Sequence, residues 1–165
     1  MKYKLLSIIA VSALCLAPIS ANSHNNKRSH KTEKRVDNLT TISVSKSVEE
    51  TREILESILK EKNIKIFDVF EHSELAEEAG LKIPDTEVVV YGNPKVGTLL
   101  MQINPQIAYE LPLRFLIHSK NGKTEVAYED IKHIARQYRV KSDVVNKISA
   151  LQADLAKELQ EKATK

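Results

Sequence analysis

The sequence predicts an α+β domain in which helices pack a sheet of about five strands, with a long C-terminal helix. Short stretches rich in β-branched residues alternate with segments whose apolar residues recur every three or four positions. An Asn121-Gly122 pair, a strong signal for a tight hairpin, separates two of these stretches. The apolar fraction of 42% and the length of 165 residues suit one globular domain.

The first 21 residues have the layout of a signal peptide. Lys2 and Lys4 precede an apolar run over residues 5–17, and the small residue Ala21 closes the segment. The run is shorter than the roughly 20 residues of a membrane-spanning helix, and no later segment approaches that length. We therefore expect cleavage after Ala21, a periplasmic or secreted protein, and no transmembrane helix in the mature chain.

Cys15, the single cysteine, allows a second interpretation of this segment as a lipid anchor. Bacterial lipoprotein signals have a small residue directly before the cysteine, whereas this chain has the bulky Leu14 there. Cleavage after Ala21 would leave a chain without cysteine. Disulfides, thiol catalysis and thiolate metal sites are then excluded from the mature chain.

A basic segment follows, and it predicts a disordered tether over residues 22–38. Residues 22–35 are polar and contain no apolar side chain to bury. Two roles are open, a solvated linker or a segment that holds the domain near anionic lipid or another polyanion. Loss of Lys2 and Lys4 lowers the formal net charge of +3 by two, so charge gives no argument for nucleic acid, and export argues against it.

The domain is predicted over residues 39–140 and begins with a strand and a helix. Residues 39–46 alternate between apolar and polar and predict the first strand. Ser47 and Glu50 have the spacing of a capping box, which predicts a helix that ends near Asn63. Its expected buried stripe consists of the pairs Ile54/Ile58 and Leu55/Leu59.

The next strands are separated by a short helix. Residues 64–72 are rich in Ile, Val and Phe and predict a strand, after which Ser73 is expected to cap a helix that Gly80 closes. Residues 87–91 predict a third strand. The continuous run Val88-Val89-Val90 is typical of a strand covered on both faces, so we expect it in the centre of the sheet.

A helix and a hairpin follow this strand. Asn93 as the N-cap and Pro94 at the first helical position predict the helix. Residues 113–118 and 124–128 flank the Asn-Gly pair and are expected to pair antiparallel. The apolar side of the helix is predicted to contain Val96, Leu99, Leu100 and Ile103.

Two more helices complete the chain. Residues 130–138 predict the first, with Ile131, Ile134 and Ala135 inward, and residues 141–165 hold the second, which begins at Ser142. The narrow apolar stripe of the last helix either packs on the sheet or pairs with the same helix of a second chain, which leaves a homo-oligomer open. This stripe consists of Val144, Ile148, Leu151, Leu155 and Leu159.

The stretch from Val88 to Met101, VVVYGNPKVGTLLM, resembles the most recognisable block of the domain of unknown function 302 family. Leu111-Pro112-Leu113-Arg114 and His72 also match positions of that family's pattern. The resemblance covers residues 39–140 and implies an α+β domain with a mostly antiparallel sheet and no established reaction. Asp130-Ile131 departs from the family's Asp-Pro, which puts only the start of that helix in question.

The turn over residues 93–98 is a candidate anion site. Free backbone amides at a helix start and the positive end of the helix dipole attract anions, and Lys95 adds a charge there. In the structural alternative, Asn93 and Pro94 only start the helix and Gly97 allows close packing. The Walker pattern is absent, so nucleotide hydrolysis has no support.

His72, Met101 and His118 are candidate metal ligands, because imidazole and thioether groups suit copper and haem. None of them shows ligand spacing, and Met101 as core filler and His72 at a strand end are the alternatives. No cofactor is assigned.

Arg114 lies four residues before His118 on one strand, so the two side chains share a face. The guanidinium is expected to pair with a carboxylate, Glu110 or Asp68, or to hold an anionic ligand in its planar fork.

We predict a non-enzymatic exported binding module for a small anion or a metal-containing ligand. A Gly-x-Ser-x-Gly elbow is absent. One alternative is a periplasmic enzyme for a small anionic substrate, with His72 as general acid or base and Arg114 as charge stabiliser. Another is a dimeric assembly protein that acts through its last helix. The candidate ligand contacts are His72, Asn93, Lys95, Met101 and Arg114.

Overall fold

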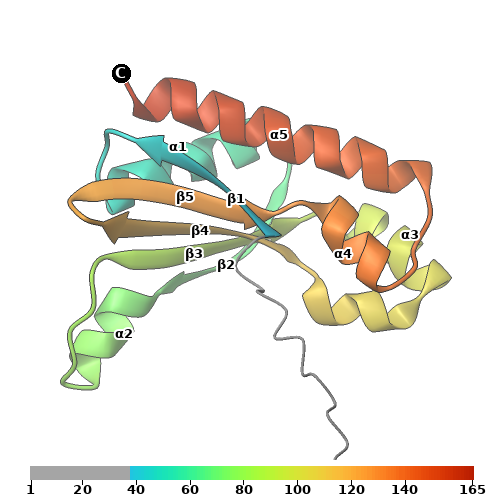
Figure 1. Ribbon diagram of the computed structural model, residues 1–165, viewed down its shortest axis with the longest axis horizontal. Helices are drawn as coiled ribbons and strands as arrows, with labels where there is room; N and C mark the ends of the chain where they lie inside the picture. The colour runs from blue at the N-terminus through green and yellow to red at the C-terminus, as the bar shows by residue number, and fades with distance from the viewer. Residues whose placement is uncertain (1–37) are drawn as a thin grey trace, which may run out of the picture. The chain divides into compact units, whose positions relative to one another are not determined.

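The computed structural model describes residues 38–165. The predicted signal peptide over residues 1–21, and all of the predicted tether except Asn38, lie outside the described residues. Along the chain the elements are β1 (Leu39–Val44), α1 (Val48–Glu61), β2 (Lys65–Glu71), α2 (His72–Glu78), β3 (Thr86–Gly92), α3 (Pro94–Ile103), the 3₁₀ helix η2 (Pro105–Glu110), β4 (Leu113–Lys120), β5 (Lys123–Glu129), α4 (Ile131–Gln137) and α5 (Asp143–Ala163) (Figure 1).

The five strands form one sheet in the order β1-β5-β4-β3-β2, and every neighbouring pair is antiparallel. This confirms the predicted α+β class with its antiparallel sheet and long last helix. The hairpin between β4 and β5 turns at Asn121 and Gly122, whose φ angles are 52° and 74°. Two positive φ angles in succession are the requirement of the tight hairpin turn that the Asn-Gly pair predicts.

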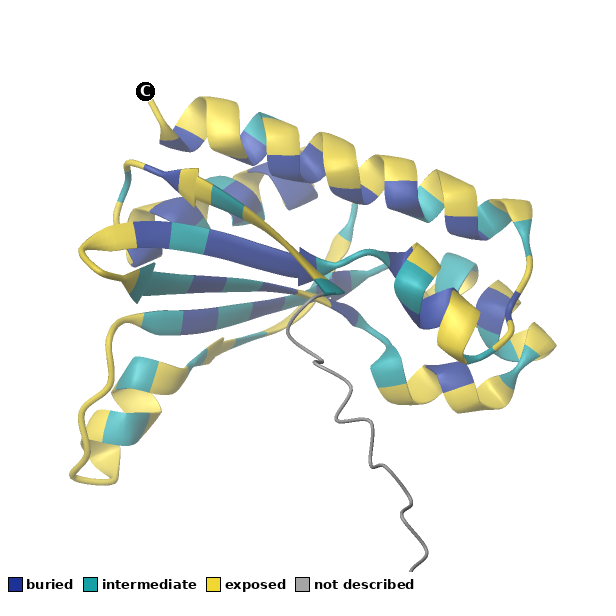
Figure 2. Ribbon diagram, viewed as in Figure 1, coloured by how far each residue is buried: buried dark blue, intermediate teal, exposed yellow. Residues whose placement is uncertain are grey.

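The hydrophobic core lies between one face of the sheet and the helices. Val89, Phe115 and Val126 are fully buried on three neighbouring strands, and they meet the buried stripe of α1. Helix α5 packs along α1 and contacts β1, and Figure 2 shows its buried side facing the rest of the domain. The buried residues of α1 include Leu55, Ile58 and Leu59 of the predicted stripe.

Strand β3 differs from its prediction. It lies next to the edge strand β2, and β4 occupies the centre of the sheet. Val89 is buried, whereas Val88 and Val90 are only half-buried. The expectation that both faces are covered was therefore wrong, because Val89 packs in the core with the residues of α1 while Val88 and Val90, on the other side of this run, stay half-buried.

Helix α2 begins differently from its prediction. Its N-cap is Glu71, which makes no capping bond with its side chain. Ser73 does not cap the helix; its hydroxyl accepts the N–H of Thr86 at 3.3 Å and so ties α2 to β3. Gly80 closes the helix as predicted, with a φ of 74° and its N–H donating to the carbonyl of Glu77 at 2.9 Å.

The buried side of α5 is rotated from the predicted stripe. Leu151 lies at the surface, whereas the polar residue Gln152 is 1% exposed. The observed buried side of α5 packs within the same domain. Its buried residues are Val145, Ser149, Gln152, Leu155, Ala156, Leu159 and Ala163.

Helix α3 also buries less than predicted, since Leu100 is its buried residue while Leu99 and Ile103 are about half exposed. Among the helices at residues 38–165, none combines the length and the apolar character needed to cross a bilayer.

Candidate functional site

The sheet face that the helices leave uncovered carries a band of apolar side chains. The strand register aligns Phe70, Val88, Leu116 and Ala127 in one row across β2, β3, β4 and β5. Because successive residues of a strand point to opposite faces, this row lies opposite the core residue Val89. We call Leu39, Phe67, Phe70, Val88, Val90 and Leu116 the open apolar face.

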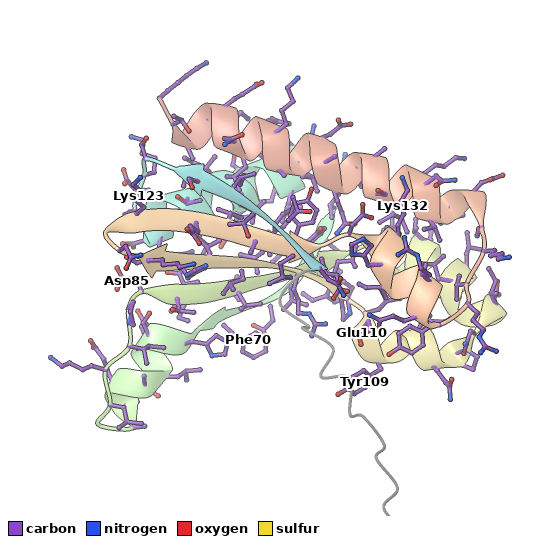
Figure 3. The ribbon with its side chains drawn as sticks, in the orientation of Figure 1. Phe70, Asp85, Tyr109, Glu110, Lys123 and Lys132 are labelled. Carbon is purple, nitrogen blue, oxygen red and sulfur yellow. The ribbon has the colours of Figure 1, made fainter. Side chains whose placement is uncertain are left out.

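Two phenylalanines project from β2 at one edge of this face. Phe67 and Phe70 are 41% and 43% exposed, and Figure 3 shows Phe70 on the side of the sheet away from α5. The register shifts between Ile66 and Asp68, which places Phe67 in a β-bulge. Its ring lies beside Gly92, where a Cβ would be 3.6 Å from Phe67 Cε2, so the glycine leaves room for the ring.

A hollow of about 200 Å³ lies at the other edge of this face. Leu39 of β1, Ala127 of β5 and Ile134 of α4 give it an apolar lining. Its polar rim carries Glu110, Arg114 and Glu129. The face therefore has exposed phenylalanines at one edge and a hollow with a mixed apolar and charged lining at the other.

Arg114 is paired within the domain. Its Nη2 atom lies 3.4 Å from Oε2 of Glu110, and the hydroxyl of Tyr138 donates to Oε1 of the same carboxylate at 3.1 Å. Of the two carboxylates expected, Glu110 is the partner. The Arg114 side chain is 52% exposed, so its remaining donors face the surface.

His118 occupies the opposite polar margin of the face. Its Nε2 atom lies 3.6 Å from Oε2 of Glu125, and Nζ of Lys120 lies 3.7 Å from the same oxygen. His118 and Arg114 share one face, as predicted, because Leu113, Phe115 and Ile117 take the core side of β4. The apolar band is thus bordered by charged residues of both signs.

The amides at the start of α3 already have acceptors. The side-chain oxygen of Asn93 accepts the N–H of Lys95 at 3.0 Å, which confirms Asn93 as the N-cap. The carbonyl of Asn93 accepts the N–H groups of Val96 and Gly97 at 3.0 and 2.9 Å. Since Pro94 has no N–H, this first turn offers an anion only the exposed ammonium of Lys95. The anion site stays a prediction.

The candidate metal ligands lie on three different elements, with His72 at the start of α2, Met101 in α3 and His118 in β4, and their role stays a prediction. Within residues 38–165, no three His, Cys, Asp or Glu side chains gather closely enough to hold a metal ion. Met101 packs against the hydrophobic core. The ring of His72 stacks on Phe70, with 6.2 Å between the ring centroids, so it extends the aromatic edge of the open face.

His72 and Arg114 lie at different levels of the sheet. The register aligns Asp68, Val90 and Arg114 in one row. Strand β2 ends at Glu71, three residues or about 10 Å beyond Asp68, and His72 follows as the first residue of α2. The two groups proposed for acid-base catalysis therefore start from different levels of the sheet, and their convergence stays a prediction.

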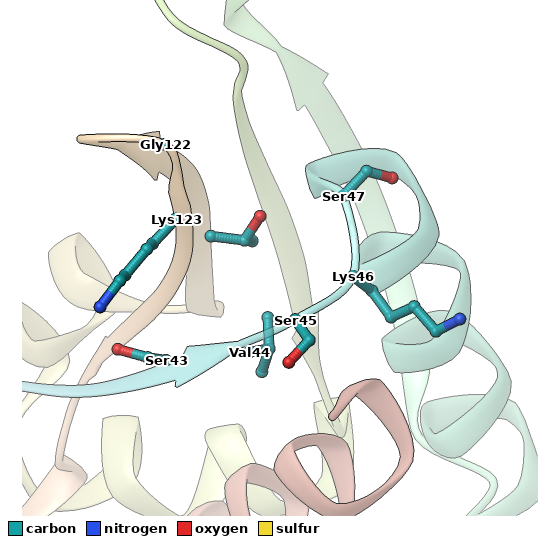
Figure 4. Close-up of a pocket in the computed structure, with 8 residues that line it drawn as sticks. Ser43, Val44, Ser45, Lys46, Ser47, Gly122 and Lys123 are labelled. Atoms are coloured by element: carbon teal, nitrogen blue, oxygen red, sulfur yellow. The ribbon is translucent and has the colours of Figure 1, made fainter. Parts of the chain in front are cut away.

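A second hollow lies between the end of β1 and the β4–β5 turn (Figure 4). Its lining includes three serines and two lysines, Ser43, Ser45, Ser47, Lys46 and Lys123. Figure 4 shows the amino groups of Lys46 and Lys123 pointing in opposite directions. Lys46 lies 3.8 Å from Glu50, and the hydroxyl of Ser47 caps α1, so these groups do not converge on a ligand.

Sequence reasoning did not identify Phe67 and Phe70 as surface residues. A signal was present in the Val88-Val89-Val90 run, which predicts two covered faces. The chain supplies one cover, and the neighbouring aromatic residues lie on the uncovered side. A strand that is apolar on both faces, in a chain whose helices supply one covering layer, could have indicated that one face of the sheet is apolar and exposed.

A family model described as "Domain of unknown function DUF302" matches residues 40–162, which extends the predicted resemblance through α5. A crystal structure of an uncharacterized conserved DUF302 protein from Bacillus stearothermophilus has a similar fold. Its TM-score is 0.63 at 20% sequence identity, over 76% of this chain and 98% of that chain.

Curated relatives carry the name of an ion channel. The chain is 35% identical over 112 residues to the Fluoride-specific ion channel FluC 1 of Brucella suis and to that of Brucella abortus. The match covers 66% of this chain, and it spans 44% and 42% of those two proteins. The chain therefore spans less than half the length of the curated relatives that it matches.

Proposed function

Because the chain belongs to the DUF302 family, whose description assigns no reaction, we propose from its surface that it is a non-enzymatic docking module. The open apolar face would bind the apolar surface of a protein partner. One observation carries the proposal, namely that β3 has an apolar run suited to two covering layers while Val88 and Val90, on the side opposite the core, are only half-buried.

The exposure of the aromatic residues supports this proposal. Phe67 and Phe70 expose more than two fifths of their surface, and Leu39 exposes 46%. Aromatic side chains are enriched where protein interfaces bury their central residues. A contiguous exposed apolar patch on a folded domain marks an interaction site more often than scattered apolar residues do.

The polar groups at the margins of this face have partners within the domain. Arg114 is paired with Glu110, and His118 with Glu125, at opposite margins of the face. Arg114 lies level with Asp68 of β2, whereas His72 follows the end of that strand, so the two residues start from different levels of the sheet. The part of the chain that the structure describes therefore favours a role in binding the surface of a partner.

The curated relatives suggest a membrane context for such a module. Their printed name is that of a fluoride-specific ion channel, and the matched part is less than half of each protein. The described residues of this chain contain no helix able to cross a bilayer. We propose that the shared part is an accessory domain of those proteins, with the same docking role, and that the pore lies in the remainder.

Export remains part of the proposal. Residues 1–21 have the charged start, apolar run and small closing residue of a signal peptide. The docking partner would then be met in the periplasm or outside the cell.

Hydroxyl-radical footprinting tests the docking role. Labelling of Phe67 and Phe70 is compared between the purified, highly diluted chain and a native extract that contains it. The proposal expects lower labelling of both residues in the extract, with Leu151 on α5 as the exposed control. Equal labelling of Phe67 and Phe70 in the two samples would contradict the proposal.

A further inference from the structure

We propose that the partner of the open apolar face is a second copy of this chain, packed sheet against sheet about a two-fold axis. The inference rests on the proposed function, since it names a partner for the same surface. Two sheets that pack face to face lie about 10 Å apart and interdigitate their side chains.

The face is complementary to itself. Phe67 and Phe70 project from β2 at one edge, and the hollow beside Leu39 and Ala127 lies at the other edge. Strand β4 lies midway between these edges. A two-fold axis along β4, between two facing sheets, would place β2 of each copy over β1 and β5 of the other. Phe67 and Phe70 of each copy would then pack against the hollow of the other copy. The same contact is made twice, as a symmetric dimer interface requires.

The polar margins suit the rim of such an interface. Arg114 with Glu110 borders the apolar row on one side, and His118 with Glu125 borders it on the other. Protein interfaces have a core depleted in charged residues and a polar rim. The central row of Phe70, Val88, Leu116 and Ala127 contains no charged residue.

The whole outer face of the sheet, with its polar margins included, is about the size of a small stable interface. Five strands spaced by about 4.8 Å, with about seven residues at 3.3 Å each, give a face of roughly 24 by 23 Å. Two such faces would bury at most about 1,100 Å², which is close to the roughly 1,000 Å² expected of a specific interface.

The edges of the sheet are less suited to self-association than its open face. Helix α5 lies along β1, and Nε2 of Gln160 donates to the carbonyl of Ser43 at 3.3 Å. The opposite edge strand, β2, contains the bulge at Phe67 and the charged residue Lys65. Bulges and lysines are features that prevent strands from pairing edge to edge. We therefore place the dimer contact on the open apolar face and not on the edges of the sheet.

Sedimentation of three proteins tests this inference, each purified after expression of the full 165-residue sequence. They are the wild type, Phe70→Asp on the open face, and Leu151→Asp on α5 as a control of similar exposure and equal charge change. We expect the wild type and the control to be dimers. Phe70→Asp is expected to weaken dimerisation by about 1,000-fold, since each dimer loses two buried aromatic contacts.

A second variant, Leu116→Arg in the centre of the same face, distinguishes loss of the contact from local unfolding of β2, because Leu116 lies on β4. Circular dichroism checks that each variant is folded. A wild type that stays monomeric at about 100 μM would overturn the dimer, because even weak specific complexes associate there. A dimer that Phe70→Asp and Leu116→Arg leave intact would also overturn it. A monomer whose Phe67 and Phe70 are protected in native extract would leave the docking role standing and assign it to a different partner.

Discussion

The guanidinium of Arg52 lies 2.7 Å from Glu87, measured from Nε to Oε2, across the interface between α1 and β3. Glu56 at 3.1 Å and Glu71 at 4.0 Å also contact this guanidinium. Glu87 is 8% exposed, and burial raises the pKa of its carboxyl above its usual value despite the attraction of Arg52. The Arg52 guanidinium thus contacts three carboxylates, of which Glu87 is the most buried.

The raised pKa of Glu87 makes a prediction about pH. The folded state binds the Glu87 proton more tightly than the unfolded state, so the contribution of this group to stability is complete below the unfolded pKa. That contribution is lost as the pH rises through the folded pKa. Glu87→Gln removes this loss, so its unfolding free energy relative to wild type should increase as the pH rises above the ordinary glutamate pKa of about 4.3.

Urea denaturation of both proteins at several pH values measures this difference. Glu53→Gln, on the exposed side of α1, is the control and should show no comparable trend. If Glu87→Gln instead became relatively less stable as the pH rises, pairing with Arg52 would outweigh burial and the assigned direction would be wrong.

Gln152 joins α5 to the junction between β5 and α4. Its Oε1 atom accepts the N–H of Ile131 at 2.9 Å, and its Nε2 atom donates to the carbonyl of Glu129 at 3.0 Å. Gln152→Ala should lower the unfolding free energy by about 3 kcal/mol, because one buried and one partly buried backbone group lose their partners and a cavity forms.

Gln160→Ala is a matched control for this prediction, since it removes the same side chain from the exposed side of the same helix. Its expected loss is below about 0.5 kcal/mol. Thermal and urea unfolding compare the two variants. Equal losses would mean that the Gln152 bonds contribute little and that the packing of α5 depends on its apolar residues alone.

The sequence predicts the elements of this fold better than the layers that cover them. Local signals were sufficient for Ser47 with Glu50, for Asn93 with Pro94 and for the Asn-Gly turn, because capping and turn chemistry act within a few residues. The order of the strands depends on contacts between distant residues. The position of β3 beside an edge strand was for this reason beyond the local pattern.

The candidate site shows the same limit. Alternation along β4 placed Arg114 and His118 on one face correctly. The burial of Gln152 in place of Leu151 was not predictable, because the partners of Gln152 are backbone groups about twenty residues away. The open apolar face likewise appears only when β2, β3 and β4 are aligned in their register.

The capping box of α1 gives a prediction about local stability. The hydroxyl of Ser47 accepts the N–H of Glu50 at 3.1 Å, and the Glu50 carboxylate accepts the N–H of Ser47 at 3.0 Å. Ser47→Ala should lower the unfolding free energy by about 1 kcal/mol. Ser57→Ala, on the exposed surface of the same helix, should change it by less than about 0.5 kcal/mol. A Ser47→Ala midpoint in urea equal to that of Ser57→Ala would show that the box does not stabilise the helix.

The start of α3 gives a prediction about anion binding. The N–H groups of Lys95, Val96 and Gly97 are all bonded to Asn93, so only the Lys95 ammonium is available to an anion. We expect inorganic phosphate to cause weak, non-saturating shifts of these amide resonances that added salt removes, as for a solvated surface charge. Lys95→Ala should abolish them, whereas Lys157→Ala, an exposed lysine on α5, should not. A saturable response at low phosphate concentration, lost in Lys95→Ala, would instead support the anion site predicted from the sequence, and the Asn93 bonds would then have to open when the ligand binds.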